Sequence, residues 1–458
     1  MTAVRSDSKN HTDTSVWRSP SARSAVVSAA ARVAILPLTG VTSIVLARTI
    51  TGTYGVEAYA VFSLVVSLPL LLPVIDLGLG AAVTNAAAGL PSEAEKFVAI
   101  LRASGKYLLG GCAIGLLVIN LIGLLQLWPP ILGVDQVLGM NWGVCLALSV
   151  FLMTMPASIG YAILIGLKRN PLAILLQGVA PILSGLVVIA ASLQLNLQSI
   201  IAISTIGIPI ASWLALAMAI ASLRARGIRP NLRRPVQTRP ALFGSAGPML
   251  VIALAMPFAI QGGRLILSWR ASLEDVAVYS AAMIAFLPVF SIAQVAGRSL
   301  WGEYAHDRAN HHSSTRRFAI GLTTGAVIGL GGFAGLVVAG PFVSRLAVGN
   351  AVHVPWALYW LLGGVVLVQA LHLASGMYLT DSRGLRFQAL TTVLTVVFVT
   401  SCTVVLVGSA GTLAPAISLL IGLTLCQFVP CLLHAVSRLS VRERWLTYAG
   451  HSKSSART

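Results

Sequence analysis

Apolar residues along this chain gather in long runs that are separated by short polar gaps. Twelve of these runs are each about 20 residues long, the length that a helix needs to cross the hydrocarbon core of a bilayer. Their approximate ranges are 33–52, 58–86, 107–127, 142–166, 172–193, 198–222, 242–266, 276–297, 318–340, 356–379, 388–408 and 413–436. The pattern predicts an all-α, polytopic integral membrane protein with about 12 transmembrane helices.

Basic residues are distributed unevenly between the gaps. All but four of the 31 lysines and arginines fall in the N-terminal region or in every second gap. Because basic residues mark the cytoplasmic side of a membrane protein, we expect both termini to be cytoplasmic. The expected location is the bacterial inner membrane. The four exceptions are Arg48, Arg264, Arg270 and Arg345, and they need a separate explanation.

The overall composition agrees with a membrane protein. The chain is 57% hydrophobic and 10% charged, whereas soluble domains are about 25% charged. A net charge of +18 would suit nucleic acid, but the basic residues flank the apolar runs instead of covering one soluble face. We therefore assign them to topology and to contact with anionic lipid headgroups, and exclude nucleic acid as a partner. The five cysteines all lie in apolar runs without a CxxC pair, which argues against a metal site.

The longest basic gap divides the chain into two sets of six predicted helices. We expect a cytoplasmic N-terminal tail at 1–24, a six-helix bundle at 25–222, a basic cytoplasmic linker at 223–241, a second bundle at 242–436 and a cytoplasmic tail at 437–458. Because six is even, the second half enters the membrane in the same direction as the first, as parallel repeats do. A weak similarity between Val56–Pro69 and Asp275–Pro288, which both end in Leu-Pro, supports such a repeat.

Motifs for catalysis are missing from the sequence. There is neither a phosphate-binding G-x-x-x-x-G-K-[ST] loop nor an H-E-x-x-H zinc motif, and the polar gaps are too short for a catalytic domain. We therefore predict that the protein is not an enzyme and needs no cofactor. His372 lies near Gln369 inside a predicted span; we interpret it as a packing residue, with a cavity-facing role as the alternative.

Charged side chains inside the spans are candidates for function, because a charge in hydrocarbon is costly unless it faces water or a partner. Asp76 lies within the second run, after two prolines and before Gly78 and Gly80. This composition predicts a broken helix that borders a wet or protein-lined space. The alternative is that Asp76 ends a shorter helix at the cytoplasmic interface. Arg48 and Glu57 flank the first outer gap, where they would form either a surface salt bridge or the rim of a central cavity.

The second half carries a corresponding polar patch. Gln261 and Arg264 lie near the outer end of the seventh run, and Arg270 follows in the next gap, where it is alternatively only a loop charge. Together with Arg48, these arginines would place positive charge between the two halves. A guanidinium fork binds two phosphate oxygens at once, so the pattern favours a cargo that carries phosphate.

Three short motifs open the chain in a distinctive order. They are Ile44-Val-Leu-Ala-Arg48, Gly55-Val-Glu57-Ala-Tyr59 and Asp76-Leu-Gly78-Leu-Gly80. This opening resembles the polysaccharide-transporter branch of the multidrug/oligosaccharidyl-lipid/polysaccharide (MOP) exporter superfamily, the group that holds the Wzx-type O-antigen and capsule flippases. The second half repeats the opening more faintly. Where the family usually has an Asp-Arg pair, this chain has Gly263 and Arg264, so a glycine stands in place of the aspartate.

The resemblance implies two six-helix bundles in a V around a central cationic cavity that works by alternating access. The implied cargo is an undecaprenyl-diphosphate-linked oligosaccharide for O-antigen, capsule or exopolysaccharide synthesis. The implied partners are membrane lipids, a polysaccharide polymerase and chain-length machinery. Lipid II flippases are similar but usually carry extra helices, which this chain lacks.

Two alternatives to the flippase remain open. The first is a multidrug/cation antiporter of the same superfamily, which would require more intramembrane carboxylates than Asp76 provides. The second is a membrane polysaccharide polymerase or ligase, which would require a large external loop with catalytic groups.

Overall fold

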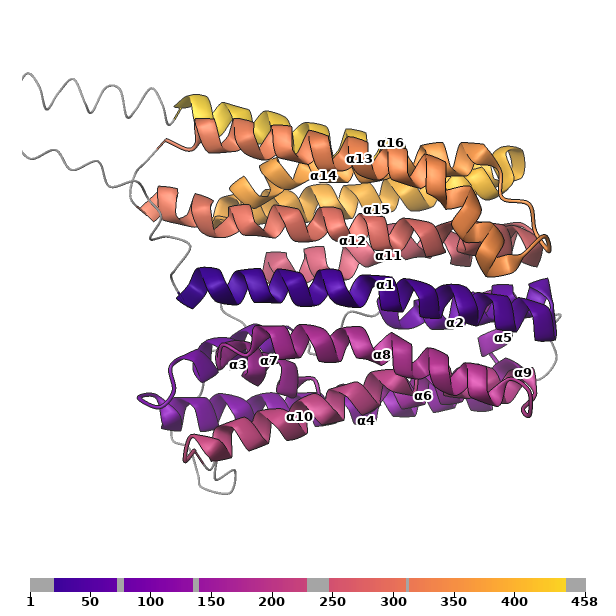
Figure 1. The fold of residues 1–458 in the computed structure, drawn as a ribbon, viewed down its shortest axis with the longest axis horizontal. Helices are drawn as coiled ribbons and strands as arrows, with labels where there is room; N and C mark the ends of the chain where they lie inside the picture. The colour runs from indigo at the N-terminus through magenta and orange to yellow at the C-terminus, as the bar shows by residue number, and fades with distance from the viewer. Residues whose placement is uncertain (1–19, 72–77, 135–139, 229–246, 310–312, 442–458) are drawn as a thin grey trace, which may run out of the picture.

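The computed structural model describes residues 20–71, 78–134, 140–228, 247–309 and 313–441, and all regular structure within them is helical (Figure 1). In these residues, nine helical segments are long and apolar enough to cross a membrane, and α2 and α6 are shorter apolar helices. One of the nine, Ser382–Val441, turns back at Gly411, whose φ of +51° favours glycine. The twelve predicted spans are thereby accounted for, and the predicted all-α membrane fold is confirmed.

The first half of the chain contains more helices than predicted spans, because three spans are divided. Its helices are α1 (Pro20–Tyr54), α2 (Val56–Leu71), α3 (Gly80–Ala88), α4 (Ala94–Leu124), α5 (Trp128–Leu132), α6 (Met140–Leu152), α7 (Ile159–Gly166), α8 (Asn170–Ala191), α9 (Leu197–Ile203) and α10 (Gly207–Ala225). The turn between α6 and α7 contains Pro156, which has no N–H to donate to a helical ladder. Proline thus explains one of the three divisions.

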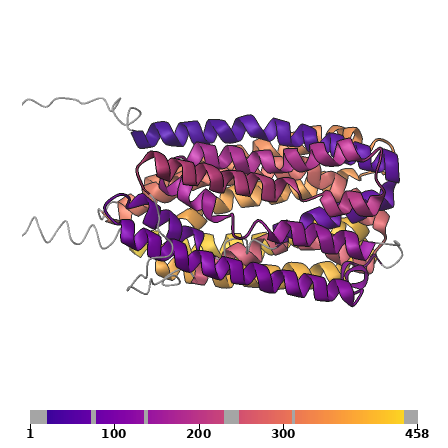
Figure 2. The ribbon, with the colours of Figure 1, turned by 90° about the horizontal axis from the view of Figure 1, so that it is seen from below.

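The second half is built from longer, less interrupted helices. They are α11 (Gly247–Arg270), α12 (Leu273–Ala309), α13 (Thr315–Val348), α14 (Trp356–Tyr378), α15 (Ser382–Ala410), the short 3-10 turn η3 (Gly411–Leu413), α16 (Ala414–Gly422) and the π-helical segment η4 (Leu423–Phe428). Helix continues from η4 to Val441. In Figure 1 these helices lie above those of the first half, with α1 along the boundary, and Figure 2 shows that the helices follow one common long axis.

The two ends of the bundle differ in charge. We use "basic end" for the end that carries the turns near Lys168, Arg226 and Arg383, on the left in Figure 1. We use "far end" for the opposite end, which carries the turns at Gly55 and Gly349.

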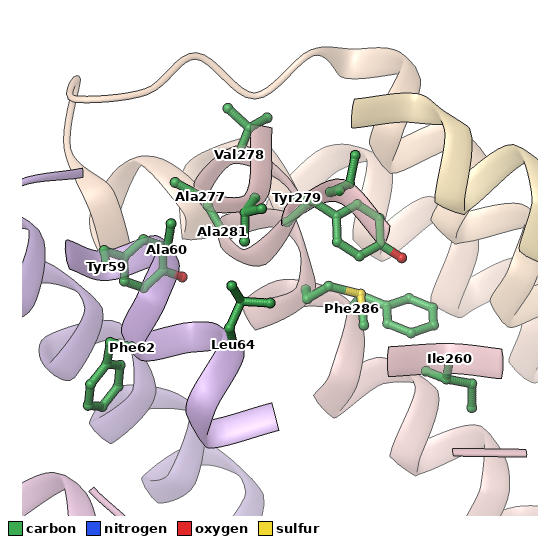
Figure 3. Close-up of a cluster of buried hydrophobic side chains, with 14 of the residues drawn as sticks. Tyr59, Ala60, Phe62, Leu64, Ile260, Ala277, Val278, Tyr279, Ala281 and Phe286 are labelled. Carbon is green, nitrogen blue, oxygen red and sulfur yellow. The ribbon is translucent and has the colours of Figure 1, made fainter. Parts of the chain in front are cut away.

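Buried apolar side chains form three clusters among the described residues. The first cluster joins both halves at the far end, where Tyr59 of α2 and Tyr279 of α12 belong to one core (Figure 3). The second, around Phe97, contains only residues of the first half, and the third, around Tyr304 and Phe318, contains only residues of the second half. Both of these separate cores lie toward the basic end. The halves therefore share a core at the far end and have separate cores at the basic end, as expected for a V.

Glycines allow the helices within each half to approach closely. A Cβ on Gly207 of α10 would collide with the carbonyl oxygen of Ala180 on α8, and one on Gly325 of α13 would lie 2.5 Å from the carbonyl oxygen of Ala370 on α14. Because these neighbours are backbone atoms, they cannot move without displacing a whole helix. Small residues at such crossings are typical of membrane helices.

We expect the substitution Gly207→Ala to destabilise the protein by about 1–3 kcal/mol, because it overpacks the contact between α8 and α10. The matched control is Gly110→Ala, at an exposed position of α4 where a Cβ meets no atom within 4 Å. The thermal midpoints of both variants in detergent, measured by intrinsic fluorescence, check this. An equal or higher midpoint for Gly207→Ala would contradict the tight crossing.

Ion pairs close the basic end of the second half. Asp307 of α12 accepts hydrogen bonds from Arg317 at 2.7 Å and from Ser314 at 3.1 Å. Asp381, in the turn before α15, pairs with Arg438 at 2.6 Å. Burial opposes the ionisation of Asp381, but the hydrogen bond and the charge of Arg438 hold the pKa of this carboxyl below its ordinary value. The first pair links α12 to α13, and the second links the turn before α15 to the last helix.

Candidate functional site

A cavity of about 680 Å³ lies between the two halves. Residues of α1, α2 and α8 line it from the first half, and residues of α11 and α12 line it from the second half. Most of the lining is apolar. The polar lining residues are Thr39, Ser43, Tyr59, Ser63, Gln261, Arg264, Ser280 and Ser291. The cavity therefore combines an apolar wall with a small number of hydrogen-bonding groups, as binding sites commonly do.

Arg264 of α11 supplies the positive charge of this cavity. Its side chain is 7% exposed, and its Nη1 donates a long hydrogen bond of 3.5 Å to the carbonyl oxygen of Ser63. Its Nε has no partner among the described residues, and no carboxylate from that part of the chain lines the cavity. A buried charge without a counterion is costly, so a negatively charged ligand would stabilise it.

The local sequence of α11 explains why Arg264 faces the cavity. A Cβ on the preceding residue, Gly263, would lie only 2.6 Å from the Cβ of Pro415 on α16. α11 therefore packs directly against α16 through Gly263. Gln261 and Arg264 are three residues apart, so they share one face of the helix, and both line the cavity.

This packing also explains the absence of the expected aspartate. A carboxylate at position 263 would meet Pro415, not the guanidinium of Arg264. Phenols lie nearby instead: Tyr59 lines the same cavity as Arg264, and the hydroxyl of Tyr279 lies 3.7 Å from a Cβ placed on Gly263.

Gln261 is the second polar group that lacks a partner. It is 4% exposed, and its Oε1 accepts no hydrogen bond from the described residues. An amide offers both donors and acceptors, which suits a ligand with hydroxyl and phosphate groups. Gln261 and Arg264 therefore form the unsatisfied polar centre of the cavity.

The far-end wall of the cavity is closed by contacts between the two halves. Ser63 Oγ of α2 and Ser280 Oγ of α12 are hydrogen-bonded at 2.7 Å, and both residues line the cavity. Near the far end, Trp269 Nε1 donates to the carbonyl oxygen of Ile131 at 2.8 Å, which links α11 to α5. These bonds join the halves on one side of the cavity.

The other predicted site residues lie outside the cavity or outside the described residues. Arg48, Glu57 and Arg270 are exposed at the far end, and the guanidinium of Arg48 lies against Gly349 in the turn between α13 and α14. Arg48 and Glu57 form no ion pair in the described part of the chain. Asp76 lies outside the described residues. The structure thus brings together Gln261 and Arg264, but does not bring Arg48, Glu57 or Arg270 to them.

Sequence reasoning missed the two serines that meet across the halves. Ser63 and Ser280 both lie in the internally similar stretches at 56–69 and 275–288, each within an apolar run. A buried serine is common in membrane helices as a local hydrogen-bonding residue, so its type gave no signal. The repeat gave no signal either, because at its offset of 219 residues Ser63 corresponds to Ala282 and Ser280 to Val61.

The sequence matches no protein-family model and no curated protein. The fold, however, is similar to solved transporters. An inward-facing multidrug resistance MATE family transporter of the MOP superfamily superposes with a TM-score of 0.67 and 14% identity, over 92% of this chain and 99% of that one. The lipid II flippase MurJ, in an inward closed conformation, superposes with a TM-score of 0.63 and 12% identity, over 91% of this chain and 92% of that one.

At this level of identity the likenesses show the fold alone, which is the fold seen in these MATE transporters and in MurJ. An outward-facing MATE transporter of the same superfamily gives a TM-score of 0.60 and 13% identity, over 92% of this chain and 96% of that one.

Proposed function

We propose that this protein is a flippase that moves undecaprenyl-diphosphate-linked oligosaccharides from the inner to the outer leaflet of the bacterial inner membrane by alternating access. The observation that supports this most strongly is the charge of the cavity. Its described lining contains one buried arginine without a counterion and no carboxylate. In this proposal the basic end, the linker at 223–241 and both tails are cytoplasmic.

The chemistry of the cargo fits this cavity. A diphosphate and several sugars cannot cross hydrocarbon unaided, because each unpaired polar group costs several kcal/mol there. The guanidinium of Arg264 would bind the diphosphate through its fork of N–H donors, and Gln261 would bind neighbouring hydroxyl or phosphate oxygens. The lipid tail would remain in the bilayer beside the bundle. We retain Arg48, Glu57, Asp76 and Arg270 as candidate contacts along the path of the cargo.

The alternative is a multidrug/cation antiporter, which the fold of the MATE neighbours supports equally. The described cavity disfavours cationic cargo. Two like charges 4 Å apart repel by about 4 kcal/mol at an effective dielectric constant of 20, and Arg264 has no neighbouring carboxylate in the described lining to offset this. The proposed partners of the flippase are membrane lipids and, downstream, a polysaccharide polymerase with chain-length machinery.

Binding measurements on the purified protein distinguish the two functions. We expect an undecaprenyl-diphosphate-linked oligosaccharide to bind in detergent, as measured by native mass spectrometry, and inorganic pyrophosphate to compete with it. A lipophilic cation such as rhodamine 6G should neither bind at the same site nor compete. Tight cation binding without any binding of the diphosphate lipid would favour the antiporter.

A further inference from the structure

Proline occurs inside every helix that lines the cavity. The five are Pro37 of α1, Pro69 of α2, Pro181 of α8, Pro257 of α11 and Pro288 of α12. Three of them, Pro181, Pro257 and Pro288, are themselves part of the cavity lining. Proline weakens a helix when it lies in the interior, so its presence in all five cavity helices needs an explanation.

A proline inside a helix leaves one carbonyl oxygen without its regular partner. The ring nitrogen carries no hydrogen, so it cannot donate to the carbonyl four residues earlier. The three lining prolines affect the carbonyls of Gln177, Ala253 and Ile284 in this way, and we call these three the freed carbonyls. No side chain of the described residues is hydrogen-bonded to any of them. In a membrane, such a carbonyl requires a partner from water, from a neighbouring group or from a ligand.

Each freed carbonyl lies on the same side of its helix as the proline that frees it. Residues four apart share one helix face, and the proline ring takes the space in front of that oxygen. Because Pro181, Pro257 and Pro288 line the cavity, the freed carbonyls border it from α8, α11 and α12. Ile284 itself lines the cavity together with Pro288. Both halves of the molecule therefore contribute a freed carbonyl to the cavity.

The freed carbonyls lie on the basic-end side of Arg264. Nη1 of Arg264 meets α2 at Ser63, which is bonded to Ser280 of α12. Ile284 follows Ser280 by four residues, or about 6 Å along the helix axis. Ala253 precedes Arg264 by eleven residues, or about 16 Å along α11. A cargo whose diphosphate is bound by Arg264 could therefore place its sugars beside these oxygens.

Uncharged acceptors suit this cavity better than carboxylates would. Sugar hydroxyls donate hydrogen bonds, and the one side-chain carbonyl in the described lining belongs to Gln261. A carboxylate would also accept these bonds, but its charge would repel a diphosphate and pair with Arg264. A main-chain carbonyl accepts a hydrogen bond without adding a charge. The prolines thus supply acceptors that leave the charge of Arg264 available to phosphate.

We propose that the freed carbonyls of Gln177, Ala253 and Ile284 bind the hydroxyl groups of the sugars next to the diphosphate. This inference rests on the proposed flippase function and divides the cavity into two parts: Arg264 binds the phosphates, and the main chain binds the sugars. A carbonyl accepts a bond from any hydroxyl within reach. The sugar part therefore selects for a hydroxyl-bearing headgroup and not for one particular sugar.

Binding to full-length protein in detergent, measured by native mass spectrometry, tests the sugar part. The probes are undecaprenyl diphosphate, undecaprenyl diphosphate glucose, and undecaprenyl cyclohexyl diphosphate, whose six-membered ring has no hydroxyl. The substitution P288A restores an N–H that can pair with the carbonyl of Ile284. We expect it to weaken binding of the glucosyl lipid about twofold to tenfold, the contribution of one hydrogen bond. Binding of the other two probes should match that of wild type.

Further variants extend and control this experiment. P257A acts on the carbonyl of Ala253 in the same way, and the losses in P257A and P288A should multiply in the double variant. The matched control is P341A, which replaces an internal proline of α13 outside the cavity lining. It should bind all three probes as wild type does.

Two results with the variants would overturn the sugar part. One is a loss in P288A that is equal for all three probes, because the proline would then act only through the shape of the helix. The other is glucosyl binding that neither P257A nor P288A weakens. Replacing an internal proline strengthens a helix, so we expect both variants to fold; if P288A does not, P257A and P181A decide.

Wild-type binding separates a failure of this inference from a failure of the proposed function. If the bare diphosphate lipid binds as tightly as the glucosyl lipid, the sugar part is wrong and the diphosphate site stands. If neither lipid binds, the proposed function fails, and the sugar part fails with it.

Discussion

Replacing Arg264 with alanine is expected to abolish transport of the lipid-linked oligosaccharide. Arg264 is the charged residue of the described cavity lining, and it is buried without a counterion. Removing one partner of a buried, hydrogen-bonded charge pair costs about 2–5 kcal/mol, which corresponds to roughly 30-fold to several thousand-fold weaker binding. Native mass spectrometry with the diphosphate lipid would measure this loss directly.

The stability of the Arg264→Ala variant separates a binding role from a structural one. An unpaired buried charge destabilises the empty protein, so the thermal midpoint without cargo should stay the same or rise. Arg264→Lys keeps the charge but loses the fork, and we expect intermediate binding. The control Arg345→Ala removes an exposed arginine of α13 that lies outside the candidate site, and it should retain binding within about twofold. Equal binding by Arg264→Ala and wild type would contradict the site.

A disulfide between positions 63 and 280 is expected to stop transport reversibly. The hydroxyls of Ser63 and Ser280 are 2.7 Å apart across the two halves, close enough for cysteines at these positions to form an S–S bond of about 2.05 Å. The bond would hold the far end closed, so cargo could enter from the basic end but not leave. Flipping by the double variant, in a background without the five native cysteines, should fall to that of empty vesicles after oxidation and recover after reduction.

The single variants Ser63→Cys and Ser280→Cys control for the substitutions themselves. Each removes one hydroxyl of the pair, and both should transport with and without oxidant. Cross-linking is measured by the mobility of the protein after cleavage between the two halves. A fully cross-linked double variant that transports at the wild-type rate would exclude opening at the far end between α2 and α12.

Much of the fold was predictable because the bilayer constrains sequence strongly. A helix in hydrocarbon must satisfy its own backbone, so its length and apolar composition appear directly in the sequence. The turns at Gly55 and Gly411, both with positive φ, fall in predicted gaps. The divided helices were harder to predict: α6 and α7 lie within one apolar run, and only Pro156 indicates the turn between them.

The site was predictable only in part, because the place of a residue within a predicted helix does not determine whether its side chain faces a cavity, a neighbouring helix or the membrane. Arg264 was selected as an exception to the charge pattern, and the structure places it in the cavity. Arg48 is the same kind of exception, yet its guanidinium lies against Gly349 at the far end. Its orientation depends on the packing of α1 against α13, which one sequence does not reveal.

Flipping of a fluorescent undecaprenyl-diphosphate-linked oligosaccharide in proteoliposomes tests the central claim most directly. The lipid is placed in both leaflets, and a membrane-impermeant reagent then quenches only the molecules that face outward. We predict that wild-type protein makes the whole lipid pool accessible to the reagent, whereas vesicles with Arg264→Ala protect about half of it, as empty vesicles do. Wild-type vesicles that protect half of this lipid, yet expel a lipophilic cation, would contradict the account.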